Sequence, residues 1–320
     1  MATIIDDSLD FSVYLHETEP LTKIKKASDY IDLVKAKFRV KKTSGVYLPW
    51  FKTIDNFGFR PGEVTLWSGQ NGHGKSLLTS QIALSLMGQG QKVCIASFEM
   101  KPATTLQRMA RMWLGINPYE LSNLEKLDDL HEQFGEWTDQ KLWLYDQMGT
   151  ANQEIIGGMT RFCAKELKIQ HVFIDNLAKC IRNEDDFNGQ KNFIDELTSI
   201  ARDYNIHVHV VHHLRKPANE NAVPDKHDNK GSGSITDQVD NVMMVFRNKA
   251  KEDDIKQNGK FAKTVNDPDQ YLLCRKQRNY EGSGEGEPSV KLWFHRDSQQ
   301  YLGEPTDPAM FFCNWPHVSS

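Results

Sequence analysis

The chain has 320 residues, enough to bury a sizeable core as one large α/β domain or two small ones. Its net charge of -4 gives no overall basic field, so any contact with nucleic acid must come from a local groove or loop. The five cysteines are far apart and lack C-x-x-C spacing, which indicates neither a zinc site nor a disulfide framework. No segment has the pattern of a membrane span or a signal peptide, so we expect a cytoplasmic protein without a membrane partner.

Residues 1–45 are expected to form an N-terminal arm that contains a short linker helix. Apolar side chains recur at helical spacing over residues 28–38, and Ser28 is the expected N-cap. The apolar face of this helix needs a partner, which is either its own domain or a neighbouring subunit. The main domain is expected over residues 46–305, followed by a tail at 306–320 that is too aromatic to be merely solvated.

A complete G-x-x-x-x-G-K-[ST] phosphate loop occupies residues 69–76, between a predicted strand and a predicted helix. Its glycines let successive N–H groups point at a phosphate, and the helix N-terminus adds its dipole. Lys75 is expected to reach the β- and γ-phosphates, and the Ser76 hydroxyl is expected to ligate Mg²⁺. The expected cofactors are therefore Mg²⁺ and ATP, or another NTP or dNTP. The predicted cofactor-binding residues of the loop are Gly69, Gln70, Asn71, Gly72, His73, Gly74, Lys75, Ser76 and Leu77.

Strands and helices alternate after this loop. Strands are predicted over 92–98, 142–145, 171–175, 206–211 and 242–246. Helices are predicted over 102–134, with a break at 117–118, and over 152–168 and 192–204. This order predicts an α/β fold with a central, mainly parallel twisted sheet flanked by helices. Three more strands, at 271–274, 289–294 and 301–302, predict a C-terminal antiparallel hairpin extension.

Two long polar segments interrupt this order, at residues 182–191 and 215–234. Both follow predicted strands, which places them at the carboxyl-terminal edge of the sheet, where such folds bind ligands. Long loops without secondary structure inside a compact domain are usually functional or disordered.

Nucleotide hydrolysis needs a metal carboxylate and a group that polarises water, and the predicted strand ends supply both. Asp175 ends an apolar strand, as a Walker B aspartate does; otherwise it caps the next helix. Glu99 follows the strand after the phosphate-loop helix, which makes it the best candidate for the general base. His213 ends another strand, where a γ-phosphate sensor would lie, and His212 alternates to the opposite face.

A basic run at residues 275–278 lies on a predicted hairpin. Such a run is normally a solvated face. A nucleotide held at a subunit boundary, however, needs cations supplied by the neighbouring subunit, as an arginine finger is.

Several motifs together resemble the RecA-like motor domain of the DnaB-type hexameric replicative helicases, especially phage primase-helicases and Twinkle. The resemblance covers about residues 50–302. It rests on 68–76 (SGQNGHGKS), 97–100 (SFEM), 172–176 (VFIDN), 211–217 (VHHLRKP), 231–240 (GSGSITDQVD) and 276–279 (KQRN).

The resemblance implies a P-loop ATPase that forms a hexameric ring, moves along single-stranded DNA and unwinds duplex DNA. It implies a catalytic site of Lys75, Glu99, His213, Lys276 and Arg278, the last two acting on the neighbouring subunit's γ-phosphate. It also implies Ser76 and Asp175 at the metal, Arg247 and Phe294 around the base, and DNA contacts from Arg215, Lys216, Lys230, Gly231 and Ser232. A primase and a DNA polymerase would be separate proteins, and a phage-encoded chain would act in the host cytoplasm.

Two other functions remain open from the sequence. One is a RecA- or KaiC-like DNA-dependent ATPase, a recombinase or assembly protein that does not separate strands. The other is a simple phosphate-loop kinase or a nucleotide-binding module without hydrolysis. A pair of cations acting across a subunit boundary, at Lys276 and Arg278, argues against the second, and the predicted histidine sensor favours the helicase over the first.

Overall fold

The computed structural model describes residues 3–5, 26–32, 35, 46–120, 127–181, 186–214, 234–278 and 289–313. Its strands are β1 (Thr3–Ile5), β2 (Val46–Tyr47), β3 (Gly58–Phe59), β4 (Val64–Gly69), β5 (Val93–Ser97), β6 (Leu142–Tyr145), β7 (His171–Asp175), β8 (His207–His213), β9 (Asn241–Arg247), β10 (Gln270–Gln277), β11 (Ser289–His295) and β12 (Gln300–Leu302). Its α-helices are α2 (Lys75–Gly88), α3 (Pro102–Leu114), α4 (Leu127–Thr138), α5 (Gln153–Lys165), α6 (Phe187–Tyr204), α7 (Ser234–Gln238) and α8 (Lys249–Asn258). Short 3-10 helices are η2 (Ala27–Tyr30), η3 (Phe51–Thr53), η5 (Leu177–Cys180) and η7 (Gly259–Phe261).

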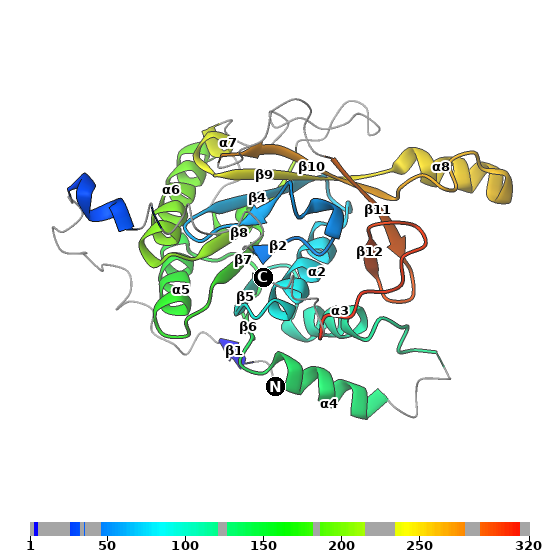
Figure 1. Ribbon diagram of the computed structural model, residues 1–320, viewed down its shortest axis with the longest axis horizontal. Helices are drawn as coiled ribbons and strands as arrows, with labels where there is room; N and C mark the ends of the chain where they lie inside the picture. The colour runs from blue at the N-terminus through cyan, green and yellow to red at the C-terminus, as the bar shows by residue number, and fades with distance from the viewer. Residues whose placement is uncertain are drawn as a thin grey trace.

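Within these residues, ten strands form one sheet in the order β1-β6-β5-β7-β8-β4-β9-β10-β11-β12. Pairing is parallel from β1 to β9 in this order and antiparallel from β9 to β12. The predicted α/β class, the mainly parallel sheet and the antiparallel extension are therefore confirmed. Helices α5 and α6 lie on one side of the sheet and α2 and α3 on the other (Figure 1).

Each face of the sheet has its own apolar core, because neighbouring residues of a strand point to opposite faces. In β7, Val172 and Ile174 belong to the core under α5 and α6, whereas Phe173 belongs to the core under α2 and α3. All three side chains are almost fully buried. Strands covered on both faces are continuously apolar, which is why the sequence shows them as short apolar runs.

The helix α2 starts directly after the phosphate loop, and its apolar side chains Leu78 and Ile82 are fully buried. Gly74, with φ of 78°, is its N-cap residue. The expected helix break at residues 117–118 is confirmed, since α3 ends at Leu114 and α4 begins at Leu127.

Several elements differ from those expected. Residues 3–5 form an edge strand that pairs parallel with β6, so the first residues of the chain join the sheet. Strands β2 and β3 form a separate small sheet. Helix α6 begins at Phe187, within the polar segment expected to be a loop over residues 182–191. Its N-terminus is set by Asp186, whose carboxylate accepts a hydrogen bond from the Gly189 N–H, a local capping signal that polarity alone hides.

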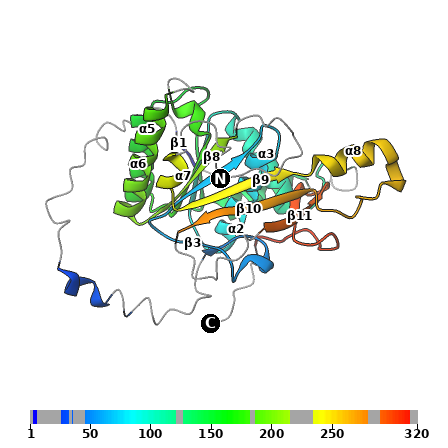
Figure 2. The ribbon, with the colours of Figure 1, turned by 90° about the horizontal axis from the view of Figure 1, so that it is seen from above.

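The charged excursion after β9 also folds into a helix, α8, which projects from the ends of β9 and β10 beyond the body of the molecule (Figure 2). Asn248 caps its N-terminus by accepting from the Lys251 N–H. Of the expected linker helix, the described part begins at Ala27, one residue before the expected cap, and Ile31 is 48% exposed. In the tail, Phe312 is fully buried and Phe311 is 70% exposed; Trp315 lies outside the described residues. Within the described chain, no helix combines the length and the apolarity of a membrane span.

Candidate nucleotide site

The phosphate loop leaves the sheet at the end of β4, between β8 and β9. Gly69 pairs with His213 on one side and with Val245 on the other. A Cβ atom on Gly69 would lie 2.7 Å from the Val245 carbonyl oxygen, so the strand end has room only for glycine. The sheet therefore closes tightly around the start of the loop. The loop itself opens at the carboxyl edge of the strands, which is the ligand side of this architecture.

Lys75 lies under the loop and is 5% exposed. Its Nζ donates hydrogen bonds to the carbonyl oxygens of Gly69, at 2.8 Å, and Gln70, at 3.0 Å. Burial lowers the pKa of Lys75 to about 8, although the charges of Asp175 and Glu99 act in the opposite direction. A cation with so little water around it interacts strongly with any phosphate that enters the loop.

The two predicted metal ligands meet at the end of β7. The Ser76 hydroxyl donates a hydrogen bond to the Asp175 carboxylate. Asp175 is 6% exposed, and burial raises its pKa, while the Ser76 hydrogen bond and the Lys75 charge oppose that rise. A hydroxyl and a carboxylate at one point are the oxygen ligands that Mg²⁺ prefers beside phosphate oxygens. The residues present thus fit a magnesium nucleotide.

Glu99, Asn176 and His213 form a hydrogen-bonded group beside this pair. The strand order β5-β7-β8-β4 brings them together, because Glu99 follows β5, Asn176 follows β7 and His213 ends β8. The Asn176 Nδ2 lies 2.6 Å from Glu99 Oε1 and 2.8 Å from His213 Nε2. His213 Nε2 and Glu99 Oε1 are 3.8 Å apart. His212, by contrast, is buried, with 2% exposure.

The fifth residue of the loop, His73, turns its ring toward β9. Its Nδ1 accepts from the Arg247 backbone N–H at 3.3 Å, and its ring centroid lies 6.1 Å from that of Phe246. Burial, followed by the Lys249 charge, lowers the pKa of His73 to about 4, so the ring is neutral near pH 7. The side chain of His73 thus anchors the loop to the sheet, and its backbone is the part available to a phosphate.

A family model described as "DnaB-like helicase C terminal domain" matches residues 50–302. The chain belongs to this DnaB-like helicase family. It is 23% identical over 261 residues to the replicative DNA helicase DnaB of Treponema pallidum (strain Nichols), covering 78% of this chain and 56% of that protein. It is 25% identical over 213 residues to that of Helicobacter pylori (strain J99 / ATCC 700824), covering 62% of this chain and 43% of that protein. The chain thus spans about half the length of the curated relatives it matches.

Two solved structures support the DnaB-like fold. The ATPase domain of a phage helicase superposes with a TM-score of 0.71 at 16% identity, covering 88% of this chain and 99% of that one. A DnaB-like replicative helicase, described together with its interactions with primase, has a TM-score of 0.67 at 16% identity, covering 88% of this chain and 67% of that one. The RecA-like fold expected from the motifs is therefore confirmed.

In this DnaB-like chain, Lys276 and Arg278 do not approach the phosphate loop. In the sheet register Lys276 stands opposite Val242, three residues before Val245, which stands beside the start of the loop. Lys276 donates to three carbonyl oxygens at the C-terminal end of α7, and Arg278 pairs with Asp240 at 3.0 Å. These cations lie toward the amino-terminal edge of the parallel strands, so they cannot complete the site of their own chain.

Arg247 lies at the loop, as the family resemblance implies. Its guanidinium donates to the Gly72 carbonyl oxygen at 3.1 Å and pairs with Glu252. Phe294 is half-buried, with its ring centroid 5.3 Å from that of Tyr301. The Tyr301 hydroxyl lies against the loop, since a Cβ on Gly74 would come within 2.5 Å of it. The structure connects Phe294 to the loop through Tyr301, a residue that the sequence analysis does not single out.

Leu77, in the first turn of α2, packs half-buried against the core, and Asn71 is exposed at the loop. The expected DNA-binding residues Arg215, Lys216, Lys230, Gly231 and Ser232 lie outside the described residues. Asn176 is the main residue that sequence reasoning misses. The one signal for it is its place directly after Asp175, at the end of a buried strand.

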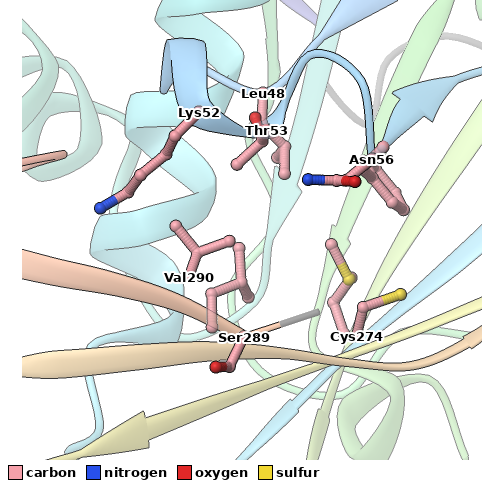
Figure 3. Close-up of a pocket in the computed structure, with 10 residues that line it drawn as sticks. Leu48, Lys52, Thr53, Asn56, Cys274, Ser289 and Val290 are labelled. Atoms are coloured by element: carbon pink, nitrogen blue, oxygen red, sulfur yellow. The ribbon is translucent and has the colours of Figure 1, made fainter. Parts of the chain in front are cut away.

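A cavity of about 90 Å³ lies elsewhere, between the segment that joins β2 to β3 and strands β9, β10 and β11 (Figure 3). Leu48, Thr53 and Val290 line it together with the Cys274 thiol. Burial raises the pKa of Cys274 to about 11, so the thiol is protonated and unreactive near pH 7. Its lining includes no residue of the phosphate loop, so it is not part of the nucleotide site.

Proposed function

We propose that this chain is the ATP-hydrolysing motor of a ring-forming replicative DNA helicase that moves along single-stranded DNA and unwinds duplex DNA. The proposal rests mainly on one arrangement in a DnaB-like chain: Lys75, Ser76, Asp175, Glu99 and His213 gather at one edge of the sheet. A phosphate-binding module without hydrolysis needs neither the carboxylate nor the histidine.

In this mechanism the loop N–H groups and Lys75 hold the nucleotide phosphates. Ser76 and Asp175 hold Mg²⁺, which neutralises charge that develops on the phosphate oxygens. Glu99 orients a water molecule and accepts its proton as that water attacks the γ-phosphorus. His213 contacts the γ-phosphate and passes its departure to the rest of the chain.

Charge also develops on the γ-phosphate at the far side from Lys75, and it needs a second cation there. We assign that role to Lys276 and Arg278 of a neighbouring subunit, in a homo-oligomeric ring of six. Their position away from their own loop is consistent with this assignment. A monomer should therefore be a poor ATPase.

The DNA contacts are assigned to Arg215, Lys216, Lys230, Gly231 and Ser232, which meet the phosphates of one strand in the central channel. A few cations per subunit, repeated around a ring, give a strong local field despite the acidic total charge. Binding should be salt-sensitive and largely independent of base sequence. A primase and a DNA polymerase are proposed as separate partners, with ATP as the fuel and the cytoplasm as the place of action.

The test compares forked-duplex unwinding with strand exchange, using the same preparation with ATP and Mg²⁺. Unwinding that Lys75→Ala abolishes is expected, together with ATP hydrolysis stimulated by single-stranded DNA. Strand exchange without unwinding would instead assign the chain to the RecA- or KaiC-like class. Mixing Arg278→Ala with Glu99→Gln subunits tests the shared site, because some mixed interfaces then carry both intact halves. Failure of the mixture to hydrolyse ATP would contradict the contribution of Arg278 from a neighbour.

A further inference from the structure

Asn176 is completely buried, with 0% exposure, yet its amide connects two groups of the proposed catalytic site. The orientation of the amide is fixed from behind. Its Oδ1 accepts a hydrogen bond from the Lys179 N–H at 3.3 Å, as the N-cap of η5. Since the oxygen is engaged there, the nitrogen faces Glu99 and His213.

The amide nitrogen carries two hydrogens, and it has two acceptors within hydrogen-bond distance. One hydrogen goes to Glu99 Oε1 at 2.6 Å and the other to His213 Nε2 at 2.8 Å. A ring nitrogen that accepts carries no hydrogen, so a neutral His213 is protonated on Nδ1. Glu99 must accept as an ionised carboxylate or through an unprotonated oxygen.

The consequence concerns the change from one nucleotide state to the next. For His213 Nε2 to donate to a phosphate oxygen, it must first acquire a hydrogen. Two N–H groups cannot then face each other at 2.8 Å, so the bond to Asn176 breaks. Engagement of a phosphate by Nε2 and retention of the Asn176 bond therefore exclude each other, and the amide that orients Glu99 changes its partners at the same time.

We propose that Asn176 is a positioning residue that holds Glu99 and His213 as one hydrogen-bonded unit, so that the carboxylate and the histidine change state together. The proposal rests on the proposed ATP hydrolysis. It adds a residue that touches neither nucleotide nor water and acts through its two neighbours.

The alternative is that Asn176 serves only to cap η5. The two roles use different atoms of the amide, Oδ1 for the cap and Nδ2 for the catalytic neighbours. Asn176→Asp separates them, because aspartate caps a helix as well as asparagine but has no N–H to donate. Asn176→Ser, which keeps a hydroxyl that can cap but is too short to reach both neighbours, is the second variant if the aspartate variant does not fold.

The first experiment measures steady-state ATP hydrolysis and the Kd for a fluorescent ADP analogue in wild type and Asn176→Asp. We expect kcat to fall by about 10- to 100-fold, since a misplaced general base loses part of its contribution. The nucleotide Kd should change by less than about threefold, because Lys75 and the loop are untouched. An unchanged kcat in Asn176→Asp beside an active wild type would overturn the inference and leave the proposed function standing.

The second experiment reads the ring directly, without activity. Nitrogen-15 NMR of labelled protein, with His213 assigned from the spectrum of His213→Gln, should show Nδ1 protonated and Nε2 unprotonated in wild type. In Asn176→Asp the carboxylate needs a donor, so Nε2 should become protonated. If wild type does not hydrolyse ATP, the proposed function fails, and the tautomer still decides the inference: a protonated Nε2 in wild type overturns it.

Discussion

Lys276 Nζ lies 2.8 Å from the carbonyl oxygen of Val239, just past the C-terminus of α7. The same ammonium group donates to the carbonyl oxygens of Thr236 and Asp237, each at 2.8 Å. The last carbonyl groups of a helix lack partners within it and carry the negative end of its dipole, so a cation satisfies them well. Lys276 therefore stabilises its own chain as well as having a proposed role at a neighbouring site.

We predict that Lys276→Met lowers the free energy of unfolding by about 1–3 kcal/mol, because the hydrogen bonds from this charged donor to three carbonyl groups are lost. Urea denaturation measures this change. Lys256→Met is the control, since Lys256 is 74% exposed on α8 and should change stability by less than about 0.5 kcal/mol. Equal stability of the two variants would contradict the capping role of Lys276.

Lys75 is predicted to reduce stability for the sake of binding. Burial holds its pKa at about 8 instead of 10.5, so the folded protein disfavours the charged form near pH 7. Lys75→Met should abolish ATP hydrolysis and yet raise the nucleotide-free stability by about 1–3 kcal/mol at pH 7. Thermal unfolding in nucleotide-free buffer beside an ATPase assay measures both. A lower melting temperature for the variant would show that the bonds to Gly69 and Gln70 outweigh the burial.

The sign of the pH dependence follows from the same residue. Between pH 8 and pH 10.5 the unfolded chain binds more protons at Lys75 than the folded chain, so this residue makes stability rise with pH in that window. Lys75→Met should lose this contribution. Denaturation at pH 7.5 and pH 9.5 would detect the difference, and identical slopes in the two proteins would count against the buried, charged lysine.

Three buried histidines beside Phe59 predict sensitivity to acid. The Trp67 indole N–H donates to His209 Nδ1 at 3.2 Å, so the other nitrogen of His209 carries the hydrogen and donates to His171 Nδ1 at 3.1 Å. His207 Nδ1 donates to the Arg60 carbonyl oxygen at 2.7 Å. Burial lowers the pKa of all three histidines, that of His207 to about 4.

As pH falls from 6.5 toward 4, the unfolded chain takes up protons that the folded chain refuses, so stability should fall in this window. His207 alone should account for about 2 kcal/mol between pH 7 and pH 5. Denaturation across this range should show a shallower pH dependence in His207→Gln than in wild type. His131→Gln, which changes an exposed histidine on α4, should keep the wild-type slope. The same slope in all three proteins would refute the prediction.

Gly69 and Gly90 offer a test of the loop geometry. Gly69→Ala would drive a Cβ to 2.7 Å from the Val245 carbonyl oxygen, whereas nothing lies within 4 Å of a Cβ on Gly90. Gly90 has φ of 81°, so Gly90→Ala still introduces backbone strain of about 1 kcal/mol. We expect Gly69→Ala to weaken binding of the fluorescent ADP analogue by at least about tenfold and Gly90→Ala to leave it unchanged. Equal binding by the two variants would show that the strand end can open.

The sequence by itself determines the phosphate loop, the alternation of strands and helices, and the residue types that nucleotide chemistry needs. Lys75 and Ser76 are recognisable because the loop is local: its geometry depends on a few consecutive residues and on glycines at fixed positions. Asp175, Glu99 and His213 are recognisable because each ends a buried strand, and parallel strands end at one edge.

The tertiary structure decides which of these side chains meet. Strand order cannot be read from local pattern, and it is the order β5-β7-β8-β4 that brings Asn176 within 2.8 Å of both Glu99 and His213. The same holds for Tyr301 at Gly74 and for Lys276 at α7, since these contacts join segments far apart in the chain. Short-range sequence signals specify elements, whereas contacts between distant residues depend on how the sheet is assembled.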